Sequence, residues 1–163
     1  YGRADKKHPV FRRPEALLSE APLLLGLDGA KMSKSRGNTI EIRMSADQTA
    51  KLIQKAKTDS QRTITYDPSE RPEVSNLLML ASLCNGRDPR QLAEEIGDGG
   101  AGKLKALVTE AVNDYFAPIR QRRQELAANE DYLLQVLHAG NDKANQVASE
   151  TLDNVRKAMK MDY

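Results

Sequence analysis

After residue 44, hydrophobic residues recur at the period of an α-helix over most of the chain. Ser45 and Gln48 form a capping-box pattern, in which each side chain bonds the backbone N–H of the other residue. Apolar residues at helical spacing follow this pattern: Ala46, Ala50, Ile53 and Ala56. Together these features predict a first helix from about residue 46 to residue 57.

The most apolar helical segment follows a predicted loop over residues 58–72. Pro72 suits the first turn of a helix, and Gly86 supplies a stop after Asn85. Apolar residues occupy most sides of this segment: Val74, Leu77, Leu78, Leu80, Ala81, Leu83 and Cys84. We therefore expect the segment 73–85 to be the buried centre of the fold.

A shorter helix is predicted next, capped by Asp88 and Pro89 and ending near Gly97. The glycine-rich residues 97–102, "GDGGAG", are interpreted as a flexible connector. A phosphate-binding loop is disfavoured there because such loops follow a strand, and this segment follows a helix.

Two further helical regions complete the pattern. A long helix carries an apolar face made of Leu104, Leu107, Val108, Ala111, Val112, Tyr115, Phe116 and Ile119. Pro118 lacks a backbone N–H and should kink this helix near Asp114. Asn129 and Asn141 each precede a helical stretch, and Gly140 between them predicts a helix stop. These elements predict a mainly α fold, an antiparallel helical bundle.

The N-terminal segment differs from the bundle. Residues 1–22 are interrupted by Pro9, Pro14 and Pro22, and residues 23–27, "LLLGL", read as a short buried strand. A single strand needs neighbours in a sheet, and residues 1–22 offer no convincing ones. We therefore expect a strand-and-loop stub before the bundle, left from a parallel sheet whose other strands lie upstream.

A turn rich in lysine and serine, "AKMSKSRGNTI" (residues 30–40), follows the apolar run. Its cationic and hydroxyl side chains belong to Lys31, Ser33, Lys34 and Ser35, and we call residues 31–35 the Lys–Ser loop. Gly37 and Asn38 tolerate turn conformations. Taken alone, such a turn is most often a solvated surface loop. Its chemistry also suits an anion with several oxygens, such as a polyphosphate.

Charge distribution favours the second interpretation. The net charge of the 163-residue chain is +2, but residues 1–62 hold 13 lysines and arginines against 7 aspartates and glutamates. Residues 63–163 hold 12 against 16, which argues against a generally basic nucleic-acid binder. No apolar stretch approaches the ~20 residues that span a bilayer, and no signal peptide is visible. The single cysteine, Cys84, favours a reducing cytoplasm.

The sequence "KMSKS" after "GLDG" resembles the signature loop of class I aminoacyl-tRNA synthetases. Residues 55–78, 102–123 and 139–161 resemble the C-terminal half of the bacterial tryptophanyl-tRNA synthetases. This resemblance implies that residues 1–44 are a remnant of a Rossmann-type catalytic domain. It also implies that residues 45–163 are a helical domain of the anticodon-binding type.

The resemblance implies a tryptophan–tRNA ligase reaction. ATP, with Mg²⁺, activates L-tryptophan, and the acyl group then passes to tRNA(Trp). Lys31, Lys34 and Ser35 would be the catalytic residues, and ATP would contact Lys31, Met32, Ser33, Lys34 and Ser35. Lysine ammonium groups would stabilise charge that develops on the phosphates, and the backbone at Met32 would lie against the adenine. The intact enzyme would be a cytoplasmic homodimer with no membrane partner, and no residue here is assigned as a metal ligand.

Part of the family's pattern has no counterpart. The His-x-Gly-His element is missing, because His8 and His138 stand alone, and the chain begins at Tyr1 rather than Met. We therefore expect a C-terminal fragment that is inactive by itself. A second hypothesis is a free-standing, non-catalytic helical module that binds tRNA or a protein.

Other charged side chains leave alternatives open. Arg120, Arg122 and Arg123 lie on a predicted helix, where arginines are usually solvated, but they could contact anticodon-stem phosphates of tRNA. Residues 58–60, "TDS", could form a simple turn or support the Lys–Ser loop.

Overall fold

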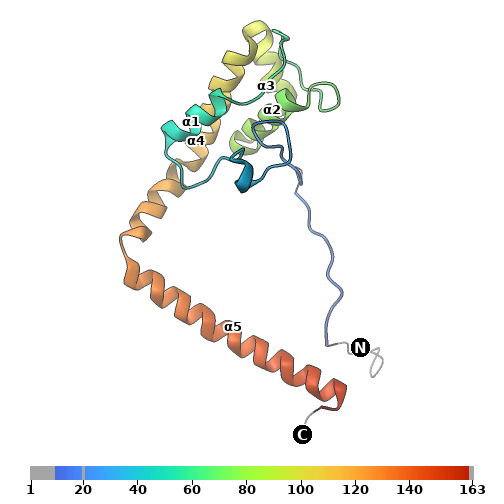
Figure 1. The fold of residues 1–163 in the computed structure, drawn as a ribbon, viewed down its shortest axis with the longest axis vertical. Helices are drawn as coiled ribbons and strands as arrows, with labels where there is room; N and C mark the ends of the chain where they lie inside the picture. The colour runs from blue at the N-terminus through green and yellow to red at the C-terminus, as the bar shows by residue number, and fades with distance from the viewer. Residues whose placement is uncertain (1–9, 20, 162–163) are drawn as a thin grey trace. The chain divides into compact units, whose positions relative to one another are not determined.

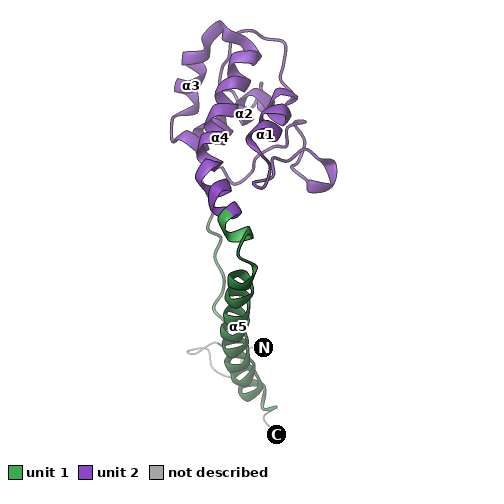
Figure 2. Cartoon of the chain, turned by 90° about the vertical axis from the view of Figure 1, so that its left-hand side faces the viewer, with its two compact units in different colours: residues 1–17, 125–163 green, residues 18–124 purple. Residues whose placement is uncertain are grey.

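The protein is described here from a computed structural model, which covers residues 10–19 and 21–161. The chain divides into two compact units, residues 18–124 and residues 1–17 with 125–163 (Figure 2). The α-helices are α1 (Ala46–Gln54), α2 (Pro72–Asn85), α3 (Pro89–Ile96), α4 (Gly100–Ala127) and α5 (Glu130–Met159) (Figure 1). Two short 3₁₀ helices are η1 (Lys34–Arg36) and η2 (Gly97–Gly99). The mainly α prediction is confirmed, whereas the division at residues 44 and 45 stays a prediction.

The unit of residues 18–124 has its core around α2. The predicted centre is confirmed, because Leu77, Leu78 and Ala81 of α2 are at most 1% exposed. Val74 of α2 is also fully buried, and other helices contribute the remaining fully buried large apolar side chains: Ile53, Leu92, Leu104, Val108 and Val112. Burying a side chain of this size stabilises the fold by about 1.5–3 kcal/mol. The outer side of α2 is more open, since Leu83 is 42% exposed.

The predicted caps at the starts of α1, α3 and α5 are confirmed. Ser45 and Gln48 form the capping box, with distances of 2.9 and 3.2 Å. The Asp88 carboxylate accepts the Arg90 N–H at the start of α3, and Asn129 accepts the Tyr132 N–H at the start of α5. Each cap satisfies a backbone donor that the first turn of a helix leaves unpaired.

The glycine-rich residues 97–102 are not a flexible connector, so that prediction is wrong. Residues 97–99 form η2, and α4 begins immediately at Gly100. Gly97 and Gly100 have φ angles of 51° and 72°, which glycine adopts at low cost. The carbonyl of Gly97 also accepts the N–H of Ile64 at 2.8 Å. The glycines therefore make a tight, anchored turn between α3 and α4.

The two long helices differ from the predicted pattern. The prediction of a stop at Gly140 is wrong, because α5 runs unbroken from Glu130 to Met159. Gly140 is not among the glycines with positive φ, and the helix-forming residues around it outweigh its cost of about 1 kcal/mol. α4 likewise continues through Pro118, and the kink near Asp114 stays a prediction. No helix in the described part of the chain is both long and apolar enough to cross a membrane.

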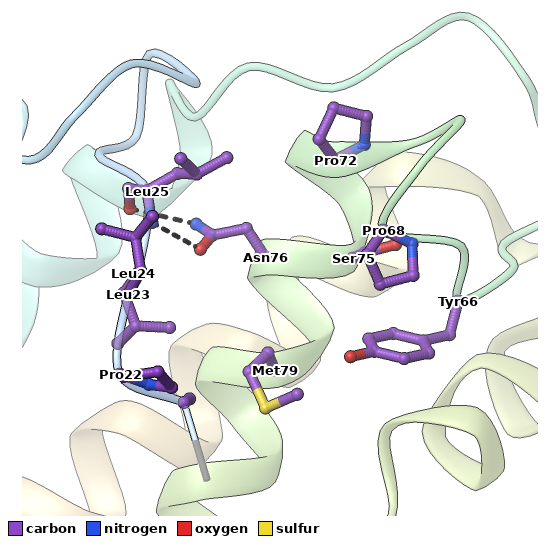
Figure 3. A pocket seen from close by; sticks show the side chains of 11 residues that line it. Pro22, Leu23, Leu24, Leu25, Tyr66, Pro68, Pro72, Ser75, Asn76 and Met79 are labelled. Atoms are coloured by element: carbon purple, nitrogen blue, oxygen red, sulfur yellow. Dashed lines mark hydrogen bonds between the residues drawn. The ribbon is translucent and has the colours of Figure 1, made fainter. Parts of the chain in front are cut away.

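Residues 23–27 do not form the predicted strand. Among the described residues the only pairing of this kind is an isolated bridge between Leu25 and Lys31. The amide of Asn76, on α2, instead receives the N–H of Leu25 at 2.8 Å and donates to its carbonyl at 3.1 Å (Figure 3). One asparagine side chain thus satisfies both backbone groups that a neighbouring strand would otherwise pair.

The segment 21–25 also borders a pocket of about 280 Å³ on the side of α2 that carries Asn76. Figure 3 shows Leu23, Leu24 and Leu25 on one side of Asn76 and Met79, and Tyr66 on the other side. The lining is largely apolar, and neither Lys31 nor Lys34 belongs to it. The pocket is therefore separate from the candidate phosphate-binding side chains.

Candidate functional site

A compact turn leads from the apolar segment into the Lys–Ser loop. Gly26 donates its N–H to the carbonyl of Ala30 at 2.8 Å, and Gly29 donates to the carbonyl of Gly26 at 2.9 Å. Asp28 accepts the N–H of Ala30 at 3.0 Å through its side chain, as aspartate often does in turns. These bonds close the turn directly before Lys31.

The Lys–Ser loop itself ends in a short 3₁₀ helix. Lys31, Lys34 and Ser35 are exposed, and the hydroxyls of Ser33 and Ser35 lie 2.8 Å apart. Gly37 ends η1 with a φ of 65°, and its N–H bonds the carbonyl of Lys34. The loop therefore has a defined backbone and solvent-facing polar side chains.

Asn38 connects the turn with the loop. Its side chain is buried, with Oδ1 accepting the Ser33 N–H at 2.8 Å. Its Nδ2 donates to Asp28 Oδ1 at 2.8 Å and to the carbonyl of Lys31 at 3.1 Å. The bond from Asn38, with the one from the Ala30 N–H, lowers the pKa of Asp28 because both stabilise its charged form.

Contacts with α2 and with the residues after α1 hold the same turn. The backbone N–H of Lys57 donates to the carbonyl of Leu27 at 2.7 Å, and its ammonium pairs with Glu73 at 2.6 Å. This ion pair raises the pKa of Lys57 and lowers that of Glu73. Gly29, at φ 81°, is close enough to Glu73 that a Cβ would lie 2.9 Å from its Cγ. The turn is therefore packed against α2.

Two ammonium groups at this loop are available for an anion. Lys31 and Lys34 form no ion pair with any residue that the structure describes, whereas Lys57 is paired with Glu73. Ser33 and Ser35 add hydroxyl donors beside them. Ammonium and hydroxyl donors on an ordered backbone are suited to bind the oxygens of a polyphosphate. The structure thus brings Ser33 and Ser35 into contact within this loop, and the binding of a phosphate there stays a prediction.

The three candidate arginines have different surroundings. Arg120, on α4, donates to Asn113 Oδ1 and to Thr49 Oγ1 of α1, both at 2.9 Å. Its Nε is buried and lacks a partner within the described residues. Arg122 and Arg123 are exposed. Arg120 is therefore engaged in joining α4 to α1, and contact of all three with tRNA stays a prediction.

Mg²⁺ has no evident protein ligands at the loop. Within residues 10–19 and 21–161, no group of three or more histidine, cysteine, aspartate or glutamate side chains could hold a metal ion. The ammonium groups of Lys31 and Lys34 do not ligate cations. Mg²⁺ stays an expectation from the resemblance, and the chemistry of the loop rests on its ammonium and hydroxyl groups.

Several residues that support the loop are not evident from the sequence. The sequence pattern marks Asn38 only as a turn residue, and Asn76 and Glu73 only as members of a helix that is expected to be buried. Polar residues within the otherwise apolar α2 were the available signal, because a polar side chain near a core needs a partner. Their partners, Leu25 and Lys57, could not be identified from spacing in the sequence.

Comparisons with known proteins identify the family to which the chain belongs. Residues 2–117 match the family model described as "tRNA synthetases class I (W and Y)". The chain is 39% identical to a tryptophan–tRNA ligase of Nostoc sp., covering 94% of this chain and 48% of that protein. It is 36% identical to the tryptophan–tRNA ligase of Thermosynechococcus vestitus, covering 95% of this chain and 49% of that protein.

A solved structure of a tryptophanyl-tRNA synthetase is similar to this chain in its fold. The tryptophanyl-tRNA synthetase of Campylobacter jejuni, complexed with ADP and tryptophan, is 31% identical and has a TM-score of 0.67. The match covers 93% of this chain and 48% of that one, so the chain spans about half the length of the relatives it matches. The chain belongs to the class I tRNA synthetase family of the W and Y type.

Proposed function

We propose that this chain forms the C-terminal part of a tryptophan–tRNA ligase and supplies its phosphate-contacting loop. The observation that carries the proposal is the pair of exposed ammonium groups of Lys31 and Lys34, which form no ion pair within residues 10–19 and 21–161. The relatives' names and the ADP and tryptophan bound to the Campylobacter jejuni protein support the same reaction.

In this role the loop acts during activation of tryptophan by ATP. Negative charge grows on the phosphates as pyrophosphate separates from the nucleotide. Lys31 and Lys34 stabilise that charge, and the hydroxyls of Ser33 and Ser35 donate hydrogen bonds to phosphate oxygens. Interactions that strengthen in the transition state raise the rate more than they raise substrate affinity.

The remaining parts of the proposal concern the whole protein. Residues 1–44 belong to the catalytic domain, and residues 45–163 form the helical domain that contacts tRNA(Trp). The complete enzyme is a homodimer that uses Mg²⁺–ATP. A reducing cytoplasm suits the free thiol of Cys84, which is the chain's single cysteine. The 163-residue chain alone is not expected to form the adenylate, because no His-x-Gly-His element is present.

The test is tryptophan-dependent pyrophosphate exchange in a complete ligase that carries this chain. Lys34→Ala is expected to lower the exchange rate by about 10²–10³-fold, as loss of one preorganised donor typically does. Tryptophan binding, measured by calorimetry, should change little. Lys51→Ala is the matched control, because Lys51 is an exposed lysine on α1 outside the loop.

An unchanged exchange rate in Lys34→Ala would contradict the phosphate role. The binding-module hypothesis would then take its place. A module without chemistry has no use for a loop that acts on phosphates, so the two hypotheses predict opposite results for this one substitution.

A further inference from the structure

The position of Asn38 is unusual for a residue in a surface loop. Only 5% of it is exposed, yet its neighbours Arg36 and Gly37 are exposed. Both donor positions of its side-chain amide are used, toward Asp28 and Lys31, and its oxygen accepts from Ser33. Its backbone carbonyl also accepts the N–H of Leu27 at 2.9 Å. The Asn38 side chain thus bonds both the turn before Lys31 and the Lys–Ser loop.

Gly26 provides the space for this amide. A Cβ built on Gly26 would lie 2.2 Å from Asn38 Nδ2 and 2.5 Å from Cγ, far inside van der Waals contact. Gly26 is not among the residues with positive φ, so a larger residue is excluded by the neighbouring amide rather than by its backbone angles. Gly26 and Asn38 therefore form a matched pair, in which the missing side chain of one admits the side chain of the other.

The hydrogen bonds of Asn38 fix the loop at both sides of Met32. The carbonyl of Lys31 and the N–H of Ser33 both end on the Asn38 side chain. Ser33 is also the residue before η1, which carries Lys34 and Ser35. Holding these backbone groups sets the course of the loop while leaving the ammonium groups in solvent. A loop ordered before its ligand arrives loses less conformational freedom on binding.

We propose that Asn38 is the positioning residue of the Lys–Ser loop, holding Lys31, Ser33 and Asp28 in the arrangement that receives a polyphosphate. The inference rests on the phosphate role proposed above for the loop. Asn38 itself is buried and contacts no phosphate in this role. It acts through the backbone of the residues that do.

The side-chain bonds of Asn38 end on residues 28–33 and not on the helices. Loss of this amide should therefore loosen the loop while leaving the melting of α1 to α4 nearly unchanged. A merely structural residue would instead lower the melting temperature without a specific change at Ser33. These two roles can be separated by measuring the loop directly.

The first measurement is amide hydrogen exchange at Ser33 in the 163-residue chain, followed by NMR. In Asn38→Ala the Ser33 N–H loses its acceptor, and its exchange is expected to accelerate about tenfold. Asn145→Ala is the matched control, because Asn145 is an exposed asparagine on α5. Unchanged exchange at Ser33 in Asn38→Ala would overturn the inference.

Rescue by a second substitution tests the contact with Asp28. Asn38→Asp keeps an acceptor for Ser33 but places a carboxylate against that of Asp28, so the two repel. In the double variant with Asp28→Asn, the amide at position 28 donates to the carboxylate at position 38, which reverses the direction of the original bond. This bond should recover part of the lost protection of the Ser33 N–H against exchange. If the double variant exchanges as fast as Asn38→Asp alone, the Asp28 contact does not hold the loop.

The second measurement is pyrophosphate exchange in the complete ligase. Asn38→Ala is expected to lower kcat about 10- to 100-fold, with the KM for tryptophan unchanged, because misplaced groups stabilise the transition state poorly. A normal rate in Asn38→Ala beside a strongly reduced rate in Lys34→Ala would overturn the inference and leave the proposed function standing. Normal rates in both variants would contradict the proposed function itself.

Discussion

The guanidinium of Arg71 holds the carboxylate of Asp59 through two parallel hydrogen bonds, 2.7 Å from Nε and 2.8 Å from Nη2. Arg71 is only 5% exposed and precedes α2, while Asp59 lies in the loop after α1. The remaining Nη1 donates to the carbonyl of Thr63 and to Thr65 Oγ1. One buried arginine thus ties the loop of residues 55–71 to the start of the central helix. These bonds favour the simple-turn interpretation of residues 58–60. Support of the Lys–Ser loop by residues 58–60 stays a prediction.

Breaking this pair is expected to destabilise the unit strongly. Arg71→Met removes every donor to the loop and should lower the free energy of unfolding by about 2–4 kcal/mol. Urea denaturation measures this loss. Arg87→Met is the control, because Arg87 pairs with Glu95 at the surface and should cost less than about 1 kcal/mol. Equal losses in the two variants would show that the burial of Arg71 is unimportant.

The same pair predicts a dependence of stability on pH. The bonds from Arg71 lower the pKa of Asp59 in the folded protein, so the unfolded chain binds a proton more readily. This stabilisation is complete above the unfolded carboxyl pKa of about 3.9 and is lost as pH falls through the lower folded pKa. Urea midpoints between pH 6 and pH 2.5 should therefore fall less in Asp59→Asn than in the parent chain. A steeper fall in the variant would contradict the direction of the shift.

Substitutions on α2 test the assigned core. Leu78 is fully buried, and Leu78→Ala should cost about 2–5 kcal/mol through lost burial and a residual cavity. Leu83, on the same helix, is 42% exposed, and Leu83→Ala should cost far less. Thermal and urea unfolding of both variants measure the difference. A loss below about 1 kcal/mol for Leu78→Ala would place α2 at the surface.

Two glycines distinguish a helix interior from a helix end. Gly140 lies within α5 with nothing within 4 Å of a Cβ, so Gly140→Ala should stabilise the helix by about 1 kcal/mol. Gly86 ends α2 at φ 72°, so Gly86→Ala should be destabilising despite equally open space. Circular dichroism during heating reports both changes. Destabilisation by Gly140→Ala would contradict the α-helical backbone at this position.

The arginines of α4 allow a test of tRNA contact in the complete ligase. If exposed Arg123 contacts a phosphate, Arg123→Ala should weaken tRNA binding. The slope of log K for tRNA binding against log salt concentration should then fall by about 1 in magnitude. Arg120→Ala should chiefly lower thermal stability, because Arg120 bonds Asn113 and Thr49. Filter binding at several salt concentrations separates the two. An unchanged salt slope in Arg123→Ala would exclude that residue from the contact.

Local signals made the helices predictable. The caps at Ser45, Asp88 and Asn129 act within one turn, so their meaning can be read from neighbouring residues. The prediction of a strand at residues 23–27 was wrong because a strand depends on partners that are distant in sequence. Asn76 supplies those partners from a helix 51 positions away, which no local pattern reveals. The Gly140 stop failed for a related reason, since glycine permits a left-handed end without requiring one.

The chemistry of the candidate site was partly predictable. Lys31, Ser33, Lys34 and Ser35 are side chains whose charge and donors are evident from their type. What holds them is less evident, because Asn38 acts by fitting into the space above Gly26. The sequence shows that Asn38 follows Gly37. It does not show that the Asn38 side chain packs against Gly26, or which donor bonds which acceptor.

The exposure of α5 determines how the chain should unfold. None of the described side chains of this 30-residue helix is buried, whereas α2 alone buries five residues. An α-helix without buried contacts depends on local propensity and capping, which leave it marginal in water. We therefore expect α5 to melt at a lower temperature than α2, so that a single transition temperature would not describe the chain. Amide protection should fall into two classes, weak along α5 and strong along α2, and calorimetric and van't Hoff enthalpies should disagree.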